Sequence, residues 1–465
     1  MRAITCSTLA IAASLVAACG ANPTAPRGQP PIAAPARVVS EDHDVVEPDG
    51  EAQPRAAADD HDQIAVDGPV IESLAEALAN PRAVVHLKLE DQALTALPPE
   101  IGLMVNLRSL DVDGNQLTSI PAEIGALVKL EELDLDDNQL TALPPAIGLL
   151  TALTSLDLDD NQLAALPDEL WRLTRLVEVD LSGNRLATVA GLGRLAQLRN
   201  LDLARNQLVS LPDDLGGIPL DRLDLSNNLL TTLPDALGGL TRLEYLAIAH
   251  NRLAQLPSTI GRLTALEELV VSDNQLRALP DELGSARGLT SIDLEQNQLT
   301  ALPASLGTLP ELRVLELDGN QLTALPASLG RLALLRKLDL EGNHLAALPD
   351  DVCALIGLEY LDVSGSQLTA LPRCLARLTR LQYLNLAGNR LTSLPAWVVE
   401  LHDLENLGLE RNRLRALPRE LRKLARLASL GLDGNPLPTR ARAGWQRWIA
   451  RQQAELDSQY ADYAD

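Results

Sequence analysis

The sequence predicts an α/β solenoid, in which a concave parallel β-sheet is backed by a convex side of short helical or irregular segments. Two observations predict this fold. An asparagine recurs every 23 residues, at Asn115, Asn138, Asn161 and Asn184, and the recurrence continues to Asn435. Each asparagine lies in the frame L-x-x-[LV]-x-[LV]-x-x-N-x-L, and because strand side chains alternate between two faces, the leucines share one face. A single unit cannot bury these leucines alone, so successive units must stack around a common core.

The same frame carries a family resemblance. A period of about 20–29 residues with this pattern is typical of leucine-rich repeats, and the chain resembles that family over sixteen frames in residues 84–438. The resemblance implies a horseshoe in which each frame asparagine bonds the backbone of its own and of the adjacent loop. Prolines such as Pro144 follow the strand loop and prevent its extension. The thirteenth frame departs from the pattern, with Ser366 where asparagine is expected.

Residues 1–18 have the pattern of a secretory signal peptide. Arg2 provides a short positive region, and an apolar run and small residues follow it. The run V-A-A-C at 16–19 resembles the bacterial lipobox. This resemblance implies that the signal is removed, that Cys19 is lipidated, and that the exported chain is anchored to the bacterial envelope. Gly20, where an aspartate would favour the inner membrane, indicates the outer membrane. The alternative is an ordinary signal peptide in which Cys19 is incidental.

Residues 19–69 are rich in proline, alanine and acidic residues and have no periodic apolar face. Such a composition cannot bury enough apolar surface to fold, so the sequence predicts a disordered tether. Two segments, 42–44 and 60–62, both read Asp-His-Asp and offer ligands to a divalent ion. The simpler interpretation, which we adopt, is a solvated acidic linker without a metal.

Repeat arrays need atypical ends that cover the open first and last units. Residues 70–83 have the pattern of an amphipathic helix that ends at an Asn-Pro pair, so we predict an N-terminal helical cap there. Residues 439–465 predict a C-terminal helical cap and a frayed tail, with Trp445 and Trp448 covering the final repeat.

Two cysteines lie within the repeats. Cys353 and Cys374 are 21 residues apart on successive convex limbs, and an oxidising compartment permits a disulfide between them. Their offset of two positions from the 23-residue period could place them beyond the reach of a disulfide. The alternative is a pair of buried free thiols that act as small apolar fillers.

Composition and motifs argue against catalysis. No lysine follows a glycine, as a phosphate-binding loop requires, and neither H-E-x-x-H nor G-x-S-x-G occurs. The parts outside the repeats are too short for a catalytic domain of ordinary size. We therefore predict a protein that is not an enzyme and that has no cofactor and no metal. The net charge of −24 disfavours nucleic acid as a partner.

A column of acidic side chains follows the predicted concave face. The central strand position is aspartate in most frames, including Asp111, Asp134, Asp157 and Asp180. Neighbouring strands lie about 4.8 Å apart, so like charges in the column repel each other. Aspartate at this position is common in such repeats, which is the simpler interpretation, but repeats two to four add further acids. We predict that a partner binds Glu131, Glu132, Asp134, Asp136, Asp137, Asp157, Asp159 and Asp160.

An apolar and aromatic interruption lies further along the same face. The acidic column breaks at Ala247 and Val270. Exposed tyrosines are common anchors of interfaces, whereas a lone histidine is more often surface filler. We predict that the partner-binding surface also includes Tyr245, His250, Tyr360 and Tyr383.

These observations predict a non-enzymatic scaffold at the cell envelope that binds a protein or peptide of basic character on its concave face. The lipid anchor is then its only contact with the membrane. The alternative is a structural envelope spacer or adhesin without a discrete partner. A hydrolase using acidic pairs is disfavoured because carboxylates on an open sheet lack a pocket. Carbohydrate binding is disfavoured because aromatic residues make up only 2% of the chain.

Overall fold

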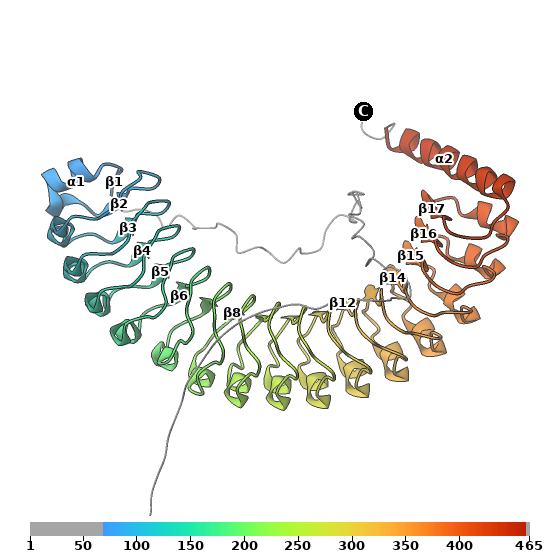
Figure 1. Cartoon of the computed structure of the whole chain (residues 1–465), viewed down its shortest axis with the longest axis horizontal. Coiled ribbons are helices and arrows are strands. Elements are labelled where there is room, and N and C mark those ends of the chain that lie inside the picture. Colours follow the sequence, from blue (N-terminus) through green and yellow to red (C-terminus); the bar gives the residue numbers. More distant parts are fainter. Residues whose placement is uncertain (1–67, 462–465) are drawn as a thin grey trace, which may run out of the picture. The chain divides into compact units, whose positions relative to one another are not determined.

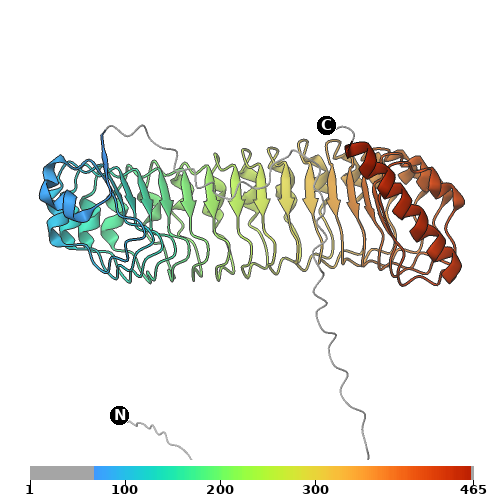
Figure 2. The same ribbon diagram turned by 90° about the horizontal axis from the view of Figure 1, so that it is seen from above.

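The computed structural model describes residues 68–461. The predicted signal peptide (1–18), nearly all of the predicted tether (19–69) and both Asp-His-Asp segments lie outside these residues. The described chain winds into a curved array of coils, with strands on the inner side and short helical turns on the outer side (Figure 1). Seen from above, the strands form one continuous row (Figure 2). The predicted fold class is confirmed.

The concave side is one parallel sheet in which strands pair in the order of the chain. Paired residues occupy equivalent frame positions, as in Asp111 opposite Asp134 and Asp134 opposite Asp157. A position in the frame is therefore a column on the sheet. The strands are β1 (Val70–Ile71), β2 (His86–Lys88), β3 (Ser109–Asp111), β4 (Glu132–Asp134), β5 (Ser155–Asp157), β6 (Glu178–Asp180), β7 (Asn200–Asp202), β8 (Arg222–Asp224), β9 (Tyr245–Ala247), β10 (Glu268–Val270), β11 (Ser291–Asp293), β12 (Val314–Glu316), β13 (Lys337–Asp339), β14 (Tyr360–Asp362), β15 (Tyr383–Asn385), β16 (Asn406–Gly408) and β17 (Ser429–Gly431).

The convex side consists of short 3₁₀ turns, most of which directly follow a proline. Pro144, for example, has extended backbone and precedes the turn Pro145–Leu149. Two steps of the repeat, from Asn184 to Asn206 and from Asn206 to Asn228, are 22 residues long rather than 23, and their turns (Leu192–Arg194 and Leu215–Gly217) have only three residues. The turns are η1 (Pro81–Ala83), η2 (Pro99–Leu103), η3 (Ala122–Ala126), η4 (Pro145–Leu149), η5 (Asp168–Arg172), η6 (Leu192–Arg194), η7 (Leu215–Gly217), η8 (Asp235–Gly239), η9 (Ser258–Arg262), η10 (Asp281–Ser285), η11 (Ala304–Thr308), η12 (Ala327–Arg331), η13 (Asp350–Ala354), η14 (Arg373–Arg377), η15 (Ala396–Glu400) and η16 (Arg419–Lys423).

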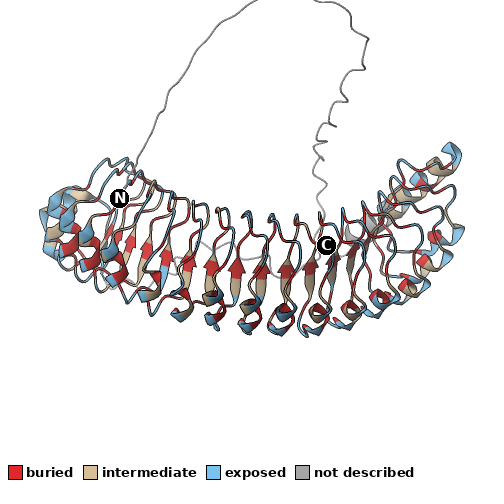
Figure 3. Ribbon diagram, turned by 60° about the horizontal axis from the view of Figure 1, so that its bottom comes forward, coloured by how far each residue is buried: buried red, intermediate tan, exposed pale blue. Residues whose placement is uncertain are grey.

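The frame leucines fill the space between the sheet and the turns. Leu133 and Leu135 are buried in this way, and buried residues continue from coil to coil through the whole described array (Figure 3). Burying apolar surface is the main force that stabilises such an array, because each coil covers the leucines of the next.

The frame asparagines form the expected ladder. The Asn138 side-chain amide donates to the backbone carbonyls of Val112, Leu135 and Asp136 at 3.0, 3.2 and 2.9 Å. Its side-chain oxygen accepts from the Leu117 N–H at 2.9 Å. One buried side chain thereby satisfies the polar backbone of two coils, which a buried loop requires. The loop ladder that the resemblance implied is confirmed.

The two ends of the array differ in part from the predicted helical caps. Val70 and Ile71 are not helical but form β1, which extends the sheet beside β2. The N-terminal helix is shorter than predicted, α1 (Leu74–Ala79), and Ser73 caps it. At the other end, α2 (Thr439–Ala461) packs Trp445 onto the core, where only 7% of it is exposed. Neither helix of the described chain is both long and apolar enough to cross a membrane.

A disulfide joins Cys353 to Cys374, with their Cα atoms 5.6 Å apart. The offset of two positions therefore does not place the cysteines out of reach, because η13 and η14 lie side by side on the convex side.

Candidate functional site

Each strand presents two side chains to the concave side, and the chain presents a third directly after the strand. In β4 these are Glu132 and Asp134, followed by Asp136, and the leucines between them are buried. The same three positions recur in every coil, so the concave face has a first, a central and a third column. We call one acidic part of the central and third columns the acidic rail; it comprises Asp134, Asp136, Asp157, Asp159, Asp180 and Asp202.

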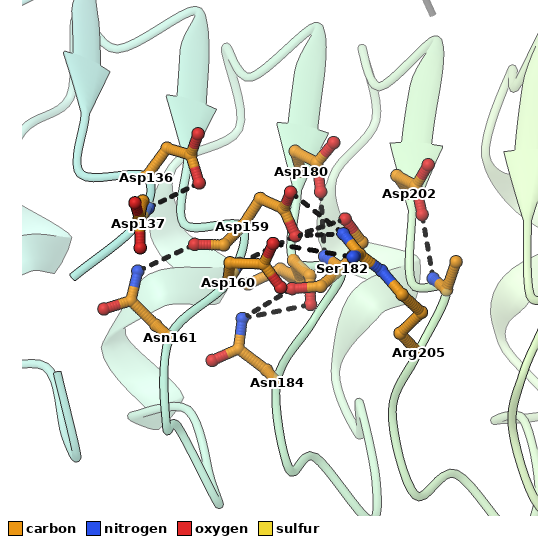
Figure 4. A network of polar contacts seen from close by, with 12 residues as sticks. Asp136, Asp137, Asp159, Asp160, Asn161, Asp180, Ser182, Asn184, Asp202 and Arg205 are labelled. Atoms are coloured by element: carbon orange, nitrogen blue, oxygen red, sulfur yellow. Dashed lines mark hydrogen bonds and ion pairs between the residues drawn. The ribbon is translucent and has the colours of Figure 1, made fainter. Parts of the chain in front are cut away.

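Backbone amides hold the carboxylates of the central column in place. The Asp134 side chain accepts from the Asp136 N–H at 3.1 Å, and the Asp157 side chain accepts from the Asp159 N–H at 2.9 Å. Asp180 and Asp202 accept equivalent bonds from Ser182 and Ala204 (Figure 4). The central aspartates therefore stabilise the turn that follows each strand. This agrees with the simpler interpretation, in which aspartate is common at this position of the repeat.

The rail is nevertheless electrostatically costly. Burial, followed by repulsion from Asp180 and Asp134, raises the pKa of Asp157 to about 8, although the hydrogen bond from Asp159 lowers it. Burial also raises the pKa of Asp202 to about 7 and that of Asp136 to about 6, with neighbouring carboxylates as a further cause. A cation placed over the rail would favour the charged forms of these groups.

One cationic side chain of the protein itself, Arg205, already forms an ion pair with the acidic rail. The Arg205 guanidinium lies 3.1 Å from Asp159 and 3.5 Å from Asp160 (Figure 4). Among the described residues, no cationic side chain forms an ion pair with Asp136 or Asp157. Within the part of the rail on β4 and β5, these two carboxylates are therefore not neutralised by an ion pair with any described residue. Arg205 was not predicted from the sequence, because its contact with Asp159, 46 positions away, skips one coil.

Five of the predicted acidic residues lie on the concave columns, and the others do not. Glu132, Asp134, Asp136, Asp157 and Asp159 occupy these columns. Glu131 precedes the strand and forms an ion pair with Arg108 at 3.1 Å. Asp137 and Asp160, and likewise His250, occupy the turn before the ladder asparagine, where φ is +42°, +42° and +53°. Glycine takes this left-handed position in other coils, as at Gly183. These turn residues therefore lie just beyond the ends of the concave strands, and their part in binding a partner stays a prediction.

The three predicted tyrosines lie in the first column but do not form one group. Tyr360 and Tyr383, on adjacent strands β14 and β15, stack with ring centroids 4.3 Å apart. Tyr245 lies on β9, where the Arg222 guanidinium sits 3.6 Å from its ring centroid. All three are half-buried rather than exposed, since neighbours in the column cover their faces. His250 lies 3.4 Å from Asp273, the residue at the same position of the next coil.

A second acidic group occupies the same columns further along the array. Carboxylate oxygens of Asp293, Glu295 and Glu316 lie within 4.8 Å of one another. Burial and the neighbouring Asp318 raise the pKa of Glu295 to about 8. Lys337 forms an ion pair with Glu316 at 2.5 Å. Oxygen ligands of this type suit Ca²⁺ or Mg²⁺, but Lys337 already supplies a positive charge there. The periodicity could have revealed this group, because Asp293, Glu295 and Glu316 repeat the positions of Asp134, Asp136 and Asp157.

Comparisons with known proteins agree with this architecture. The chain matches a model of a leucine-rich repeat region over residues 84–208. It also matches a leucine rich repeat model over residues 194–253, 264–322, 287–345 and 333–391. No curated protein matches the sequence.

Several solved structures are similar. A leucine-rich repeat protein of Leptospira interrogans is 32% identical, with a TM-score of 0.66, over 82% of this chain and 98% of that one. A plant peptide hormone receptor, solved in a complex, is 30% identical, with a TM-score of 0.65, over 76% of this chain and 58% of the receptor. A TDR receptor is 28% identical, with a TM-score of 0.69, over 79% of this chain and 67% of that one. This chain belongs to the leucine-rich repeat family.

Proposed function

We propose that this chain is a non-enzymatic scaffold that binds a basic protein or peptide on its concave face. The observation that carries the proposal is the acidic rail, in which carboxylates from successive coils lie in register on a half-buried surface. The raised pKa values of Asp136, Asp157, Asp180 and Asp202 mean that the free protein holds these charges at a cost, which a cationic partner would relieve. The similarity to a peptide hormone receptor supports a peptide or protein as the partner.

The same charge pattern argues against other partners and against chemistry. A row of carboxylates repels phosphate groups, so nucleic acid is not an expected partner. The rail carboxylates lie on an open sheet without the apolar enclosure typical of active sites. We therefore propose binding without catalysis and without a cofactor.

The rail is tested by charge reversal with a matched control. Asp134, Asp136 and Asp157 are changed to lysine in one variant, and the exposed convex residues Glu123, Asp213 and Asp235 in the other. Both variants change the net charge equally, so nonspecific electrostatics changes equally. Proteins recovered by each variant from an envelope extract are then compared, after circular dichroism has shown that both fold. We expect the rail variant to lose partners that the convex variant keeps. Identical partner sets for both variants and the wild type would refute the steering role of the rail.

We also propose that the chain is exported and anchored through a lipid on Cys19 to the outer membrane of a bacterium. The motif V-A-A-C at 16–19 supports this proposal. The test is incorporation of an alkyne-labelled fatty acid during growth. We expect label in the wild type and in Cys6→Ala, and none in Cys19→Ala. Label that persists in Cys19→Ala would exclude this anchor.

A further inference from the structure

The asparagine ladder is interrupted at one internal position. In the preceding coil, Asn343 donates to the carbonyls of Leu317 and Leu340 at 2.9 and 3.0 Å and accepts from the Leu322 N–H at 2.9 Å. Its counterpart in the next coil is Ser366. A serine hydroxyl has one donor and a short reach, so it cannot make this set of bonds. The Ser366 hydroxyl is buried and has no hydrogen-bond partner among the described residues.

The interruption affects one particular junction between coils. Elsewhere, the ladder asparagine bonds the coil before its own, 26 and 21 residues back in the chain. Counting back from Ser366 by the same intervals leads to Leu340 and Leu345, both in the coil of β13. The missing bonds are therefore those between the coil of β13 and the coil of β14.

The disulfide spans the same junction. Cys353 lies in η13, which belongs to the coil of β13, and Cys374 lies in η14, which belongs to the coil of β14. These are the two cysteines of the described chain. A covalent link therefore joins, on the convex side, the two coils whose ladder contact is missing in the interior.

The same junction also shapes the concave face. The Tyr360 hydroxyl on β14 donates to Asp339 on β13 at 3.3 Å, and the Lys337 ammonium lies 5.3 Å from the Tyr360 ring centroid. Tyr360 in turn stacks on Tyr383. A change in the spacing of these two coils would therefore move the tyrosine pair relative to the basic and acidic residues before it.

We propose that the Cys353–Cys374 disulfide is a redox-dependent clamp that replaces the missing ladder bonds at the β13–β14 junction. A dithiol reductant would convert it to two thiols, transferring two electrons and two protons and itself becoming a cyclic disulfide. Because each coil packs mainly against its two neighbours, the loosening would stay local. Strand bonds such as Leu340 N–H to Asp362 O, at 2.9 Å, would still connect the two blocks of coils.

Hydrogen exchange measured by mass spectrometry on the full chain tests the clamp. We expect a dithiol to increase amide exchange in residues 337–377 by about tenfold or more, with no change around β3 and β4. The variant Cys353→Ser with Cys374→Ser should show the same increase without a reductant, and reductant should not change it further. Adding Ser366→Asn to that variant should restore protection, because the ladder is then continuous.

A matched control separates a clamp from a general effect of ladder gaps. Asn343→Ser creates a gap at the β12–β13 junction, where no disulfide lies. Amide exchange in the coil of β12 should therefore rise equally with and without reductant. The proposal is overturned if reduction of the wild type leaves residues 337–377 unchanged, if exchange rises evenly along the array, or if Ser366→Asn restores nothing.

Discussion

A single carboxylate on the concave face experiences two opposed influences. Asp157 accepts a hydrogen bond from the Asp159 backbone, which favours its charged form. Burial and the flanking Asp134 and Asp180 favour its neutral form, and they dominate, because its pKa rises to about 8. Asp157 thus stabilises the turn, while its surroundings disfavour its charged form.

The raised pKa gives a pH dependence with a definite sign. The folded chain holds a proton on Asp157 up to about pH 8, whereas the unfolded chain releases it near the ordinary value of 3.8. The contribution of this group to stability is therefore complete below about pH 4 and is lost as the pH rises to about 8. Asp157→Asn keeps an oxygen for the Asp159 N–H but cannot ionise. We expect it to raise the melting temperature at pH 8 by about 2–4 °C and to leave it unchanged near pH 4.

The melting temperature is followed by circular dichroism at both pH values, with Asp137→Asn, an exposed turn residue, as the control. If Asp157→Asn raised the melting temperature equally at both pH values, or lowered it at pH 8, the charge on Asp157 would not destabilise the folded protein.

At the scale of the element, the unit of stability is the junction between two coils. The ladder asparagine connects these coils by bonds that nothing else in the frame supplies. We expect Asn138→Ala to lower the free energy of unfolding by about 2–4 kcal/mol, because several buried backbone groups lose their partner. The exposed neighbour, changed in Gln139→Ala, should alter it by less than about 0.5 kcal/mol. Urea denaturation checks both variants, and similar losses for the two would mean that the ladder does not support the junction.

The elements also show what the sequence could and could not predict. The columns were predictable because a period of constant length places Glu132, Asp134 and Asp157 by arithmetic. The period does not encode the left-handed backbone angle that Asp137 and His250 adopt in the turn after the strand, so it could not predict how they lie relative to the sheet. Arg205 was missed because the reach of a long side chain across a coil depends on its conformation rather than on its position.

At the scale of the whole molecule, charge varies along the array. The acidic rail occupies early coils, whereas the last coils and α2 carry many exposed arginines, such as Arg415, Arg419 and Arg447. Such a gradient favours one orientation of a charged partner as it approaches. The rail would guide the basic part of the partner to β4 and β5, away from the arginine-rich end.

The most direct test of the concave binding face is site-specific photocrosslinking in intact cells. A benzophenone amino acid is placed either at Glu132, on the concave side of β4, or at Leu149, which is 54% exposed on the convex turn of the same coil. We predict a discrete crosslinked protein or peptide from position 132 and none from position 149. Crosslinking of the same product from position 149, or no product from position 132, would contradict the proposal that partners bind inside the curve.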